Sequence, residues 1–161
     1  MMAKKDKQYF NIVNYILESD IFNGIEAFSH HGTNRLKHSM RVSYYSYIVA
    51  KSLRLDYKAA AVSGLLHDFY LCDDDKGFIK YLKFQNKHPK IAAANAITYF
   101  KVSKKEKNII ETHMWPFNKP SRYLEGWIVS LVDKGTAIYE YSAKFNHQLA
   151  LWLLSLIRII K

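Results

Sequence analysis

The sequence contains few of the residues that interrupt helices or cross-link a fold. Its 161 residues include six glycines, three prolines and one cysteine, Cys72. A single cysteine excludes an intramolecular disulfide and a cysteine-rich zinc site, and it suits a reducing compartment. The scarcity of glycine and proline favours long helices over an architecture of strands and tight turns. No segment shows sustained alternation of apolar and polar residues, so we expect no sheet.

Long apolar runs and recognisable linkers are also missing. The charged segment Met1–Lys7 is not followed by the apolar core of a signal peptide. The most apolar stretch, Leu149–Ile160, is interrupted by Arg158 and is too short to span a bilayer, which predicts a core helix. We therefore expect a cytoplasmic protein that makes no membrane contact. Because there is no repeat or low-complexity tract, residues 1–161 are predicted to form a single domain.

Negative charge is in short supply. The chain has 24 Lys and Arg residues against 14 Asp and Glu residues, which gives a net charge of +10. Such a surface attracts anions, among them small phosphorylated substrates. The basic residues are spread along the chain and form no arginine–aromatic stripe, so nucleic acid is not the expected partner. The oligomeric state cannot be predicted from these features.

Apolar periodicity and capping residues predict an all-α protein. Val42, Tyr45 and Val49 recur at spacings of three and four residues, which predicts the buried face of one helix. Asp56 is predicted as a helix N-cap, and Ser103 begins a capping box. The predicted helices cover Lys7–Glu18, Ile25–Phe28, Arg35–Leu53, Tyr57–Phe69, Phe78–Phe84, His88–Phe100, Lys104–Trp115, Arg122–Lys144 and His147–Ile160.

The dipeptide His67-Asp68 is the first chemical signal. It follows an apolar run near the predicted end of a helix. Adjacent side chains on a helix point about 100° apart, so both reach one ligand only if it lies between their directions. A metal ion meets this requirement, since it accepts imidazole nitrogen and carboxylate oxygen from different angles. A cation would also offset the cost of burying the carboxylate.

Other histidine and aspartate residues occupy inward-facing or capping positions on separate predicted helices. These are His38, His88, His113 and Asp133. His38 lies one turn before Val42, and His88 precedes Pro89, which suits the first position of a helix. A bundle that brings all these positions together would form a metal site between helices.

Each of these residues also has a purely structural interpretation. A histidine on an apolar face can be a core residue with one hydrogen bond, and His88 can be only a helix cap. Asp133 can form an ion pair with Arg41 or Lys134. The ordered combination of all six positions favours the metal site over these separate explanations.

In their order along the sequence, these histidine and aspartate motifs resemble those of the HD-domain metal-dependent phosphohydrolases. The segments His38–Val42, Ala61–Asp68 and Val129–Lys134 are similar to the first, second and last motifs of that family's H…HD…D pattern. The resemblance extends over about residues 30–140. It implies a single-domain, all-α bundle of the HD type.

The resemblance also implies a set of metal ligands. His38, His67, Asp68 and Asp133 would hold one metal, and Asp68 would bridge to a second metal held by His88 and His113. The two additional histidines are typical of the family's two-metal branch. The ions would be divalent, with iron and manganese among the candidates. A GYP motif is missing, so cleavage of cyclic di-GMP is not supported.

The expected reaction is hydrolysis of a phosphoester or phosphoanhydride in a nucleotide or small phosphorylated metabolite. A metal-activated hydroxide would attack phosphorus, and Asp68 would contribute to catalysis as the shared ligand. Lys134 or Arg41 would neutralise charge on the phosphoryl oxygens, although a plain ion pair is the alternative for both. His31 would protonate the leaving group, unless it is only a surface loop residue.

Two other functions remain open at this point. One is a non-catalytic HD module that binds nucleotide or a protein partner and keeps a structural metal. The other is nucleic-acid binding through the basic surface, which the scattered charges support poorly. The presence of every expected ligand favours the enzyme.

Overall fold

The computed structural model describes residues 6–30, 33–71 and 78–159, and it confirms the all-α class. The helices are α1 (Lys7–Leu17), α2 (Asp20–Asn23), α3 (Arg35–Ser52), α4 (Tyr57–Leu66), α5 (Phe78–Phe100), α6 (Lys104–Thr112) and α7 (Leu124–Ile159). A 3-10 turn, η2 (Gly24–Ala27), precedes two antiparallel two-residue strands, β1 (Ser29–His30) and β2 (Thr33–Asn34). Strands this short leave no alternating pattern in the sequence.

Side-chain caps begin several of the helices. The carboxylate of Asp56 accepts a hydrogen bond from the Ala59 N–H at the start of α4, and Asn34 caps α3 in the same way. At α6, Ser103 and Glu106 form the predicted capping box, each side chain accepting from the other residue's backbone N–H. These bonds satisfy N–H groups that have no partner within the helix, and so they fix where each helix begins.

Helices α3 and α4 pack closely at the centre of the structure. A Cβ on Gly64 would lie 2.9 Å from the Ser43 Cα, so only glycine allows this approach. The Ser43 hydroxyl donates to the Ala61 carbonyl at 2.7 Å. Small residues form this contact, so the predicted buried face of α3 is confirmed at Val42 but wrong at Tyr45 and Val49. Those two side chains are partly exposed, whereas Ser43 is fully buried.

Two helices are longer than the sequence predicted. Helix α5 is continuous from Phe78 to Phe100 with Pro89 inside it, so His88 is a mid-helix residue and not an N-cap. Proline loses one backbone hydrogen bond within a helix, but its fixed φ is compatible with helical geometry. Helix α7 is also continuous and spans 36 residues, because no glycine or proline breaks the chain between the two predicted helices.

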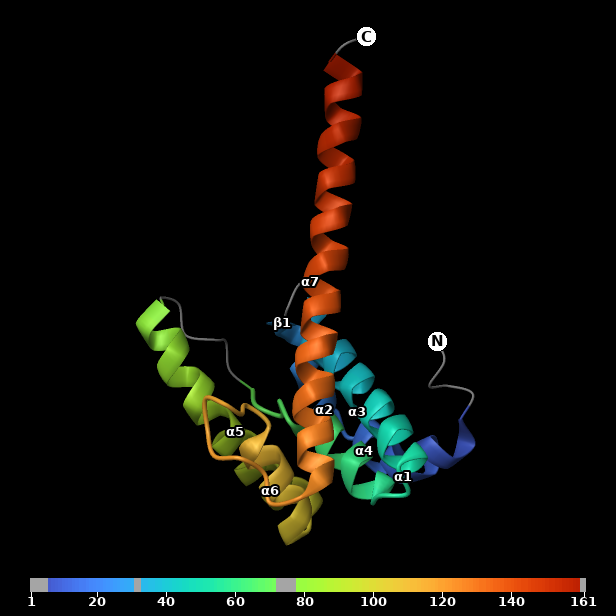
Figure 1. Ribbon diagram of the computed structural model, residues 1–161, viewed down its shortest axis with the longest axis vertical. Coiled ribbons are helices and arrows are strands. Elements are labelled where there is room, and N and C mark those ends of the chain that lie inside the picture. The colour runs from blue at the N-terminus through green and yellow to red at the C-terminus, as the bar shows by residue number, and fades with distance from the viewer. Residues whose placement is uncertain (1–5, 31–32, 72–77, 160–161) are drawn as a thin grey trace.

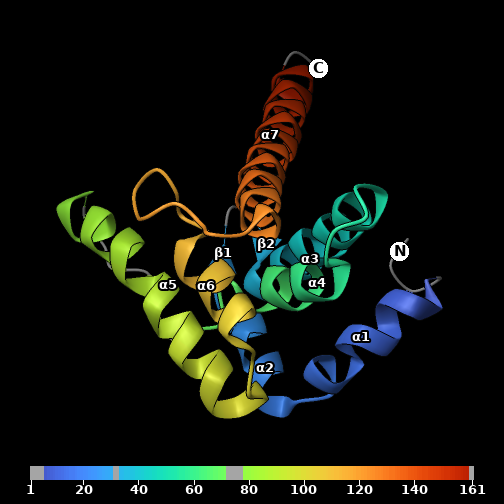
Figure 2. The ribbon, with the colours of Figure 1, turned by 60° about the horizontal axis from the view of Figure 1, so that its bottom comes forward.

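Helices α3, α4 and α6 lie between α1 on one side and α5 on the other (Figures 1 and 2). Helix α7 starts against this group and then extends well beyond it (Figure 1). The apolar run after residue 148 therefore lies on the extended part of α7, which corrects its prediction as a core helix. Within the described ranges, no helix combines the length and the apolar character needed to cross a membrane.

Candidate metal centre

The turns that follow α4 and α6 each place a histidine. The sequence predicted His67 and His113 to lie within helices. Helix α4 instead ends at Leu66 and α6 at Thr112, so the two histidines sit just past the helix ends. The Nδ1 atom of His67 lies 2.9 Å from the Gly64 carbonyl, and that of His113 lies 2.8 Å from the Ile110 carbonyl. A carbonyl can only accept, so Nδ1 carries a hydrogen in both rings, and Nε2 is the nitrogen that can bind a metal ion.

All six predicted ligand residues are buried and converge on one region. Ligand atoms within 4.8 Å of one another form three overlapping groups of three residues: His38, His67 and Asp68; His67, His113 and Asp133; and Asp68, His88 and His113. The six come from α3, the turn after α4, α5, the turn after α6, and α7. Because the groups share members, their ligand atoms form one continuous cluster that could hold a divalent metal ion.

The ligand atoms of Asp68, His88 and His113 lie close together. The two histidine Nε2 atoms lie 3.1 Å apart. The Asp68 Oδ1 atom lies 3.3 Å from His88 Nε2 and 3.7 Å from His113 Nε2. The His113 Nε2 carries a lone pair. It lies close enough to the His88 Nε2 and to the Asp68 oxygen for all three atoms to bind one cation. This geometry follows the arrangement that the resemblance implied for the second metal.

The donor set and its burial fit a divalent metal ion. Among the described residues, the buried His67 Nε2 atom makes no hydrogen bond. It lies 3.4 Å from Asp68 Oδ2 and 3.6 Å from Asp133 Oδ1, distances longer than a good hydrogen bond. A buried nitrogen of this kind is costly unless it has a partner. Mixed imidazole and carboxylate donors are suitable ligands for iron, manganese or zinc.

Glu140 is a site residue that the sequence interpretation missed. Its Oε2 atom lies 2.8 Å from His38 Nδ1, while His38 Nε2 lies 3.0 Å from Asp133 Oδ1. The second Glu140 oxygen accepts a 2.5 Å hydrogen bond from Arg41. The chain Arg41–Glu140–His38 therefore orients the His38 ring, as carboxylates commonly do for metal-binding histidines. The signal was present: Glu140 follows Asp133 by seven residues, two turns along the same face of α7.

Mutual electrostatics change the ionisation of the cluster. Burial opposes the charged form of His67, but the negative charges of Asp68 and Asp133 outweigh it and raise the His67 pKa well above its usual value. Burial likewise opposes ionisation of Asp133, yet the hydrogen bond with His38 and the nearby positive charge of His67 hold its pKa well below normal. In the absence of metal, protons on histidine therefore balance the buried carboxylates.

His113 behaves differently from its neighbours. Its burial, together with the positive charge of His67 and His88, lowers its pKa to about 3. His113 is therefore neutral over the whole physiological range, and its Nε2 lone pair is free to bind a cation without first losing a proton.

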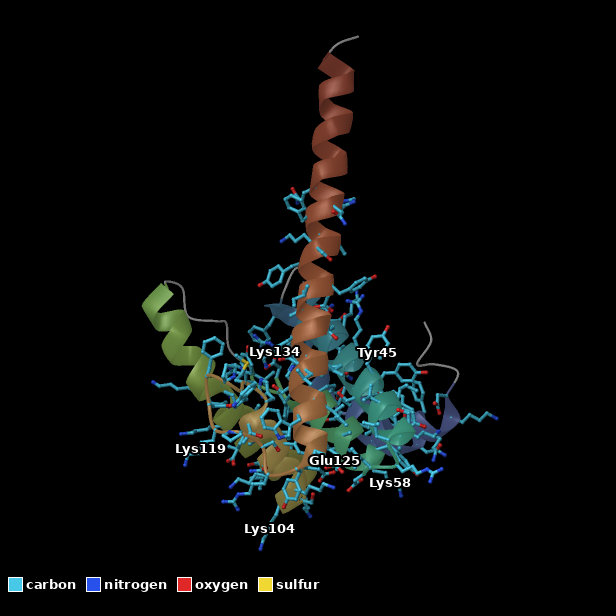
Figure 3. The ribbon with its side chains drawn as sticks, viewed as in Figure 1. Tyr45, Lys58, Lys104, Lys119, Glu125 and Lys134 are labelled. Atoms are coloured by element: carbon cyan, nitrogen blue, oxygen red, sulfur yellow. The ribbon has the colours of Figure 1, made fainter. Side chains whose placement is uncertain are left out.

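The predicted catalytic cations occupy different environments. Arg41 is partly exposed and forms an ion pair with Glu140, the structural alternative considered for it. Lys134 lies on α7, well along the helix from Glu125 (Figure 3), and its ammonium donates to the His113 carbonyl at 3.1 Å and to the Ser130 hydroxyl at 2.8 Å. Burial lowers the Lys134 pKa. His31 lies outside the described residues.

A second residue that the sequence interpretation did not single out is Arg35. It is fully buried, and its guanidinium carbon lies 3.7 Å from the centre of the Tyr70 ring. Arg35 also donates a 2.6 Å hydrogen bond to the Tyr70 carbonyl, and the Tyr70 ring packs 5.4 Å from that of His88. Arg35 thereby fixes the segment after Asp68 to the start of α3.

The sequence profile of the HD domain matches residues 35–138. The chain belongs to the HD-domain family. HD domains bind divalent metals, and the matched range includes all six residues of the cluster, with Glu140 just beyond it. No curated protein and no solved structure matched the chain.

Proposed function

We propose that this HD domain is a metal-dependent phosphohydrolase. Its substrate would be a nucleotide or another small phosphorylated metabolite, in which it cleaves a phosphoester or phosphoanhydride bond. The observation that carries the proposal is the convergence of six buried histidine and aspartate side chains in three overlapping ligand groups. A structural metal needs only one such group, with all coordination positions filled by protein.

The chain's own residues prepare the site for two divalent ions. Asp68, His67 and His113 each belong to two of the groups, and we propose Asp68 as the shared ligand because its carboxylate offers two oxygens where each imidazole offers one nitrogen. The carbonyls of Gly64 and Ile110 hold the His67 and His113 rings with Nε2 directed inward. When bound, divalent metal ions would act as Lewis acids and activate water for attack on phosphorus. Iron and manganese are the proposed candidates.

Basic residues near the cluster would assist with the charge of the substrate. Lys134 is held against the turn that carries His113, and we propose that its charge, close to Asp133, offsets negative charge that develops on the phosphoryl oxygens. Arg41 acts through Glu140 in this proposal and positions His38. Protonation of the leaving group by His31 remains a prediction from the sequence.

The experiment is metal analysis of the purified protein, followed by hydrolysis of an aryl phosphate and a bis-aryl phosphate after loading with Mn²⁺ or Fe²⁺. Asp68→Ala should lose bound metal and reduce turnover to background, because it removes a ligand shared by two groups. The matched control is Asp20→Ala, which changes an exposed aspartate outside the matched HD range. It should retain both metal and turnover.

Two results would contradict the proposal. Equal, slow release of phosphate by the loaded wild type and by Asp68→Ala would show that the cluster does not catalyse hydrolysis. Stoichiometric metal binding without turnover on either class of ester, or on nucleoside di- and triphosphates, would favour the non-catalytic binding module.

A further inference from the structure

The outer side of α7 carries a row of exposed apolar residues. Leu124, Leu131, Ile138 and Phe145 follow one another at a constant spacing of seven residues. Each of these side chains is between 63% and 69% exposed. We call these four residues the outer stripe. Single exposed apolar residues are common on proteins, but a continuous row of large ones marks an interaction surface.

The same spacing continues in the sequence of the extended part of α7. Trp152 and Ile159 occupy the next two positions at intervals of seven. Four residues after Leu124 comes Ile128, which is buried in the chain's own core. From Leu131 onward, the residues four positions after each member of the row are small or apolar: Gly135, Ser142, Leu149 and Leu156. Alternating spacings of four and three residues are the a and d positions of a heptad repeat.

A heptad repeat identifies the geometry of the partner. On a straight helix, a strict seven-residue row drifts by about 20° per repeat, so it stays in contact with a neighbour only if the two helices supercoil. The part of α7 from Tyr141 to Ile159 is about 28 Å long, and no other element of the described residues lies beside it (Figure 1). A helix of this length is only marginally stable alone in water, so it requires a packing partner.

The scarcity of charge near the outer stripe favours the same stripe of a second copy as its partner. Residues 141–148 are all exposed, and Lys144 is the only charged residue among them. The flanking positions Tyr139, Tyr141 and Asn146 are uncharged. A helix that lies on an anionic membrane would carry lysine and arginine along the edges of its apolar face. Two copies of a chain with a net charge of +10 can approach along a surface with so few charges.

The surface beside the stripe has room for a partner's side chains. A Cβ placed on Gly135 would meet no atom within 4 Å, so nothing in the chain's own packing requires glycine there. A hollow of about 380 Å³ lies next to it, between α3 and α7, and its lining includes Tyr45, Val132, Gly135 and Tyr139. The hollow and the missing side chain at Gly135 leave space for side chains of a second helix packed against this side of α7.

We propose that the outer stripe of α7 pairs with the same stripe of a second copy, so that the protein is a homodimer joined by a two-stranded coiled coil. The metal cluster lies on the opposite side of α7, since Asp133 and Glu140 are each two residues, about 200°, from Leu131 and Ile138. The dimer contact therefore does not depend on the proposed hydrolase activity.

Sedimentation equilibrium of the full chain tests this proposal. Wild type should show twice the 18.9 kDa chain mass at micromolar concentration. Phe145→Glu places like charges opposite each other in the seam and should weaken association by at least about 10-fold. The matched control is Ala143→Glu, which adds the same charge to an exposed position about 200° away and should remain dimeric.

Folding of the HD core in the variants is checked by bound metal, which should stay at the wild-type value because Phe145 is largely exposed and lies outside the metal cluster. A monomeric wild type would overturn the proposal, and so would equal weakening by the two variants. Monomeric wild type that sediments with vesicles containing phosphatidylserine would assign the stripe to a membrane surface instead.

Discussion

The two sides of α7 differ in a way that reverses the usual pattern of a surface helix. The inner side carries Asp133 and Glu140, seven residues apart and both buried. The outer side carries Leu131 and Ile138, with the same spacing and both largely exposed. An ordinary amphipathic helix would place its apolar residues inside and its carboxylates in water.

We infer from this difference that the two sides have different partners. On the inner side, the carboxylates are satisfied within the chain by His38 and Arg41, and by the metal that we propose. On the outer side, no part of the described chain covers the apolar residues, and we propose a second copy for that role. Changes on the inner side should therefore alter metal binding, and changes on the outer side should alter association.

The largest effect should come from Glu140→Gln, which replaces the second buried carboxylate on the inner side of α7 by a neutral amide. The substitution weakens the bond that orients the His38 ring, and loss of such a partner commonly reduces metal affinity by 10- to 100-fold. The measurement is the dissociation constant for Mn²⁺ from a chelator competition, together with kcat and KM on the aryl phosphate.

Glu125→Gln provides the matched control on the same helix. Glu125 is also buried on α7, but its Oε1 atom accepts from the Asp56 N–H and from Lys105, both at 2.9 Å, at the far end from the cluster. This variant should lower the thermal midpoint and leave metal affinity unchanged. If the two variants shift metal affinity equally, Glu140 does not position a ligand.

The inner side was predictable because its chemistry restricts residue types. A metal needs histidine and carboxylate donors at fixed helical positions, so His38 and Asp133 stand out on otherwise apolar faces. Glu140 follows the same rule and was missed only because it lies outside the recognised motifs. The roles of Lys134 and Arg41 in catalysis stay predictions.

In the rest of the fold, local sequence patterns predicted the helix caps but not which face of a helix is buried, because burial depends on tertiary packing. Asp56 and Ser103 cap their helices as predicted, since capping depends on a few neighbouring residues. The exposed side of α3 was predicted as buried because Tyr45 and Val49 are apolar, whereas the real contact with α4 uses small polar residues such as Ser43. Proline at 89 was read as a helix start, although a helix interior also accepts its φ.

The stability of the metal-free protein should decrease as the pH rises, because of the ionisable residues of the metal cluster. The folded pKa of His67 is raised well above its unfolded value of about 6.5. The charge on His67 therefore contributes its full stability below about pH 6.5, and that contribution is lost as the pH rises through the folded pKa. The lowered pKa of Asp133 acts only at acidic pH and is constant over this window.

In the presence of a chelator, the thermal midpoint should therefore fall as the pH rises above 6.5, because unprotonated histidines leave the buried carboxylates without positive charge. With Mn²⁺ bound, the metal supplies that charge and the fall should disappear. The measurement is a pair of thermal unfolding series over pH, with and without metal. Parallel series would show that no metal replaces the proton on His67.

The smallest effect compares one substitution at two glycines. Gly64→Ala would force a Cβ to within 2.9 Å of the Ser43 backbone and should destabilise the fold by about 1–3 kcal/mol. Gly135→Ala meets open space and should stabilise the helix by up to about 1 kcal/mol, a rise of about 2–4 °C in Tm. Both are measured in the Phe145→Glu background, so that pairing between copies does not contribute. A loss of stability at Gly135 there would mean that packing within one chain, and not a partner, requires glycine on the outer side.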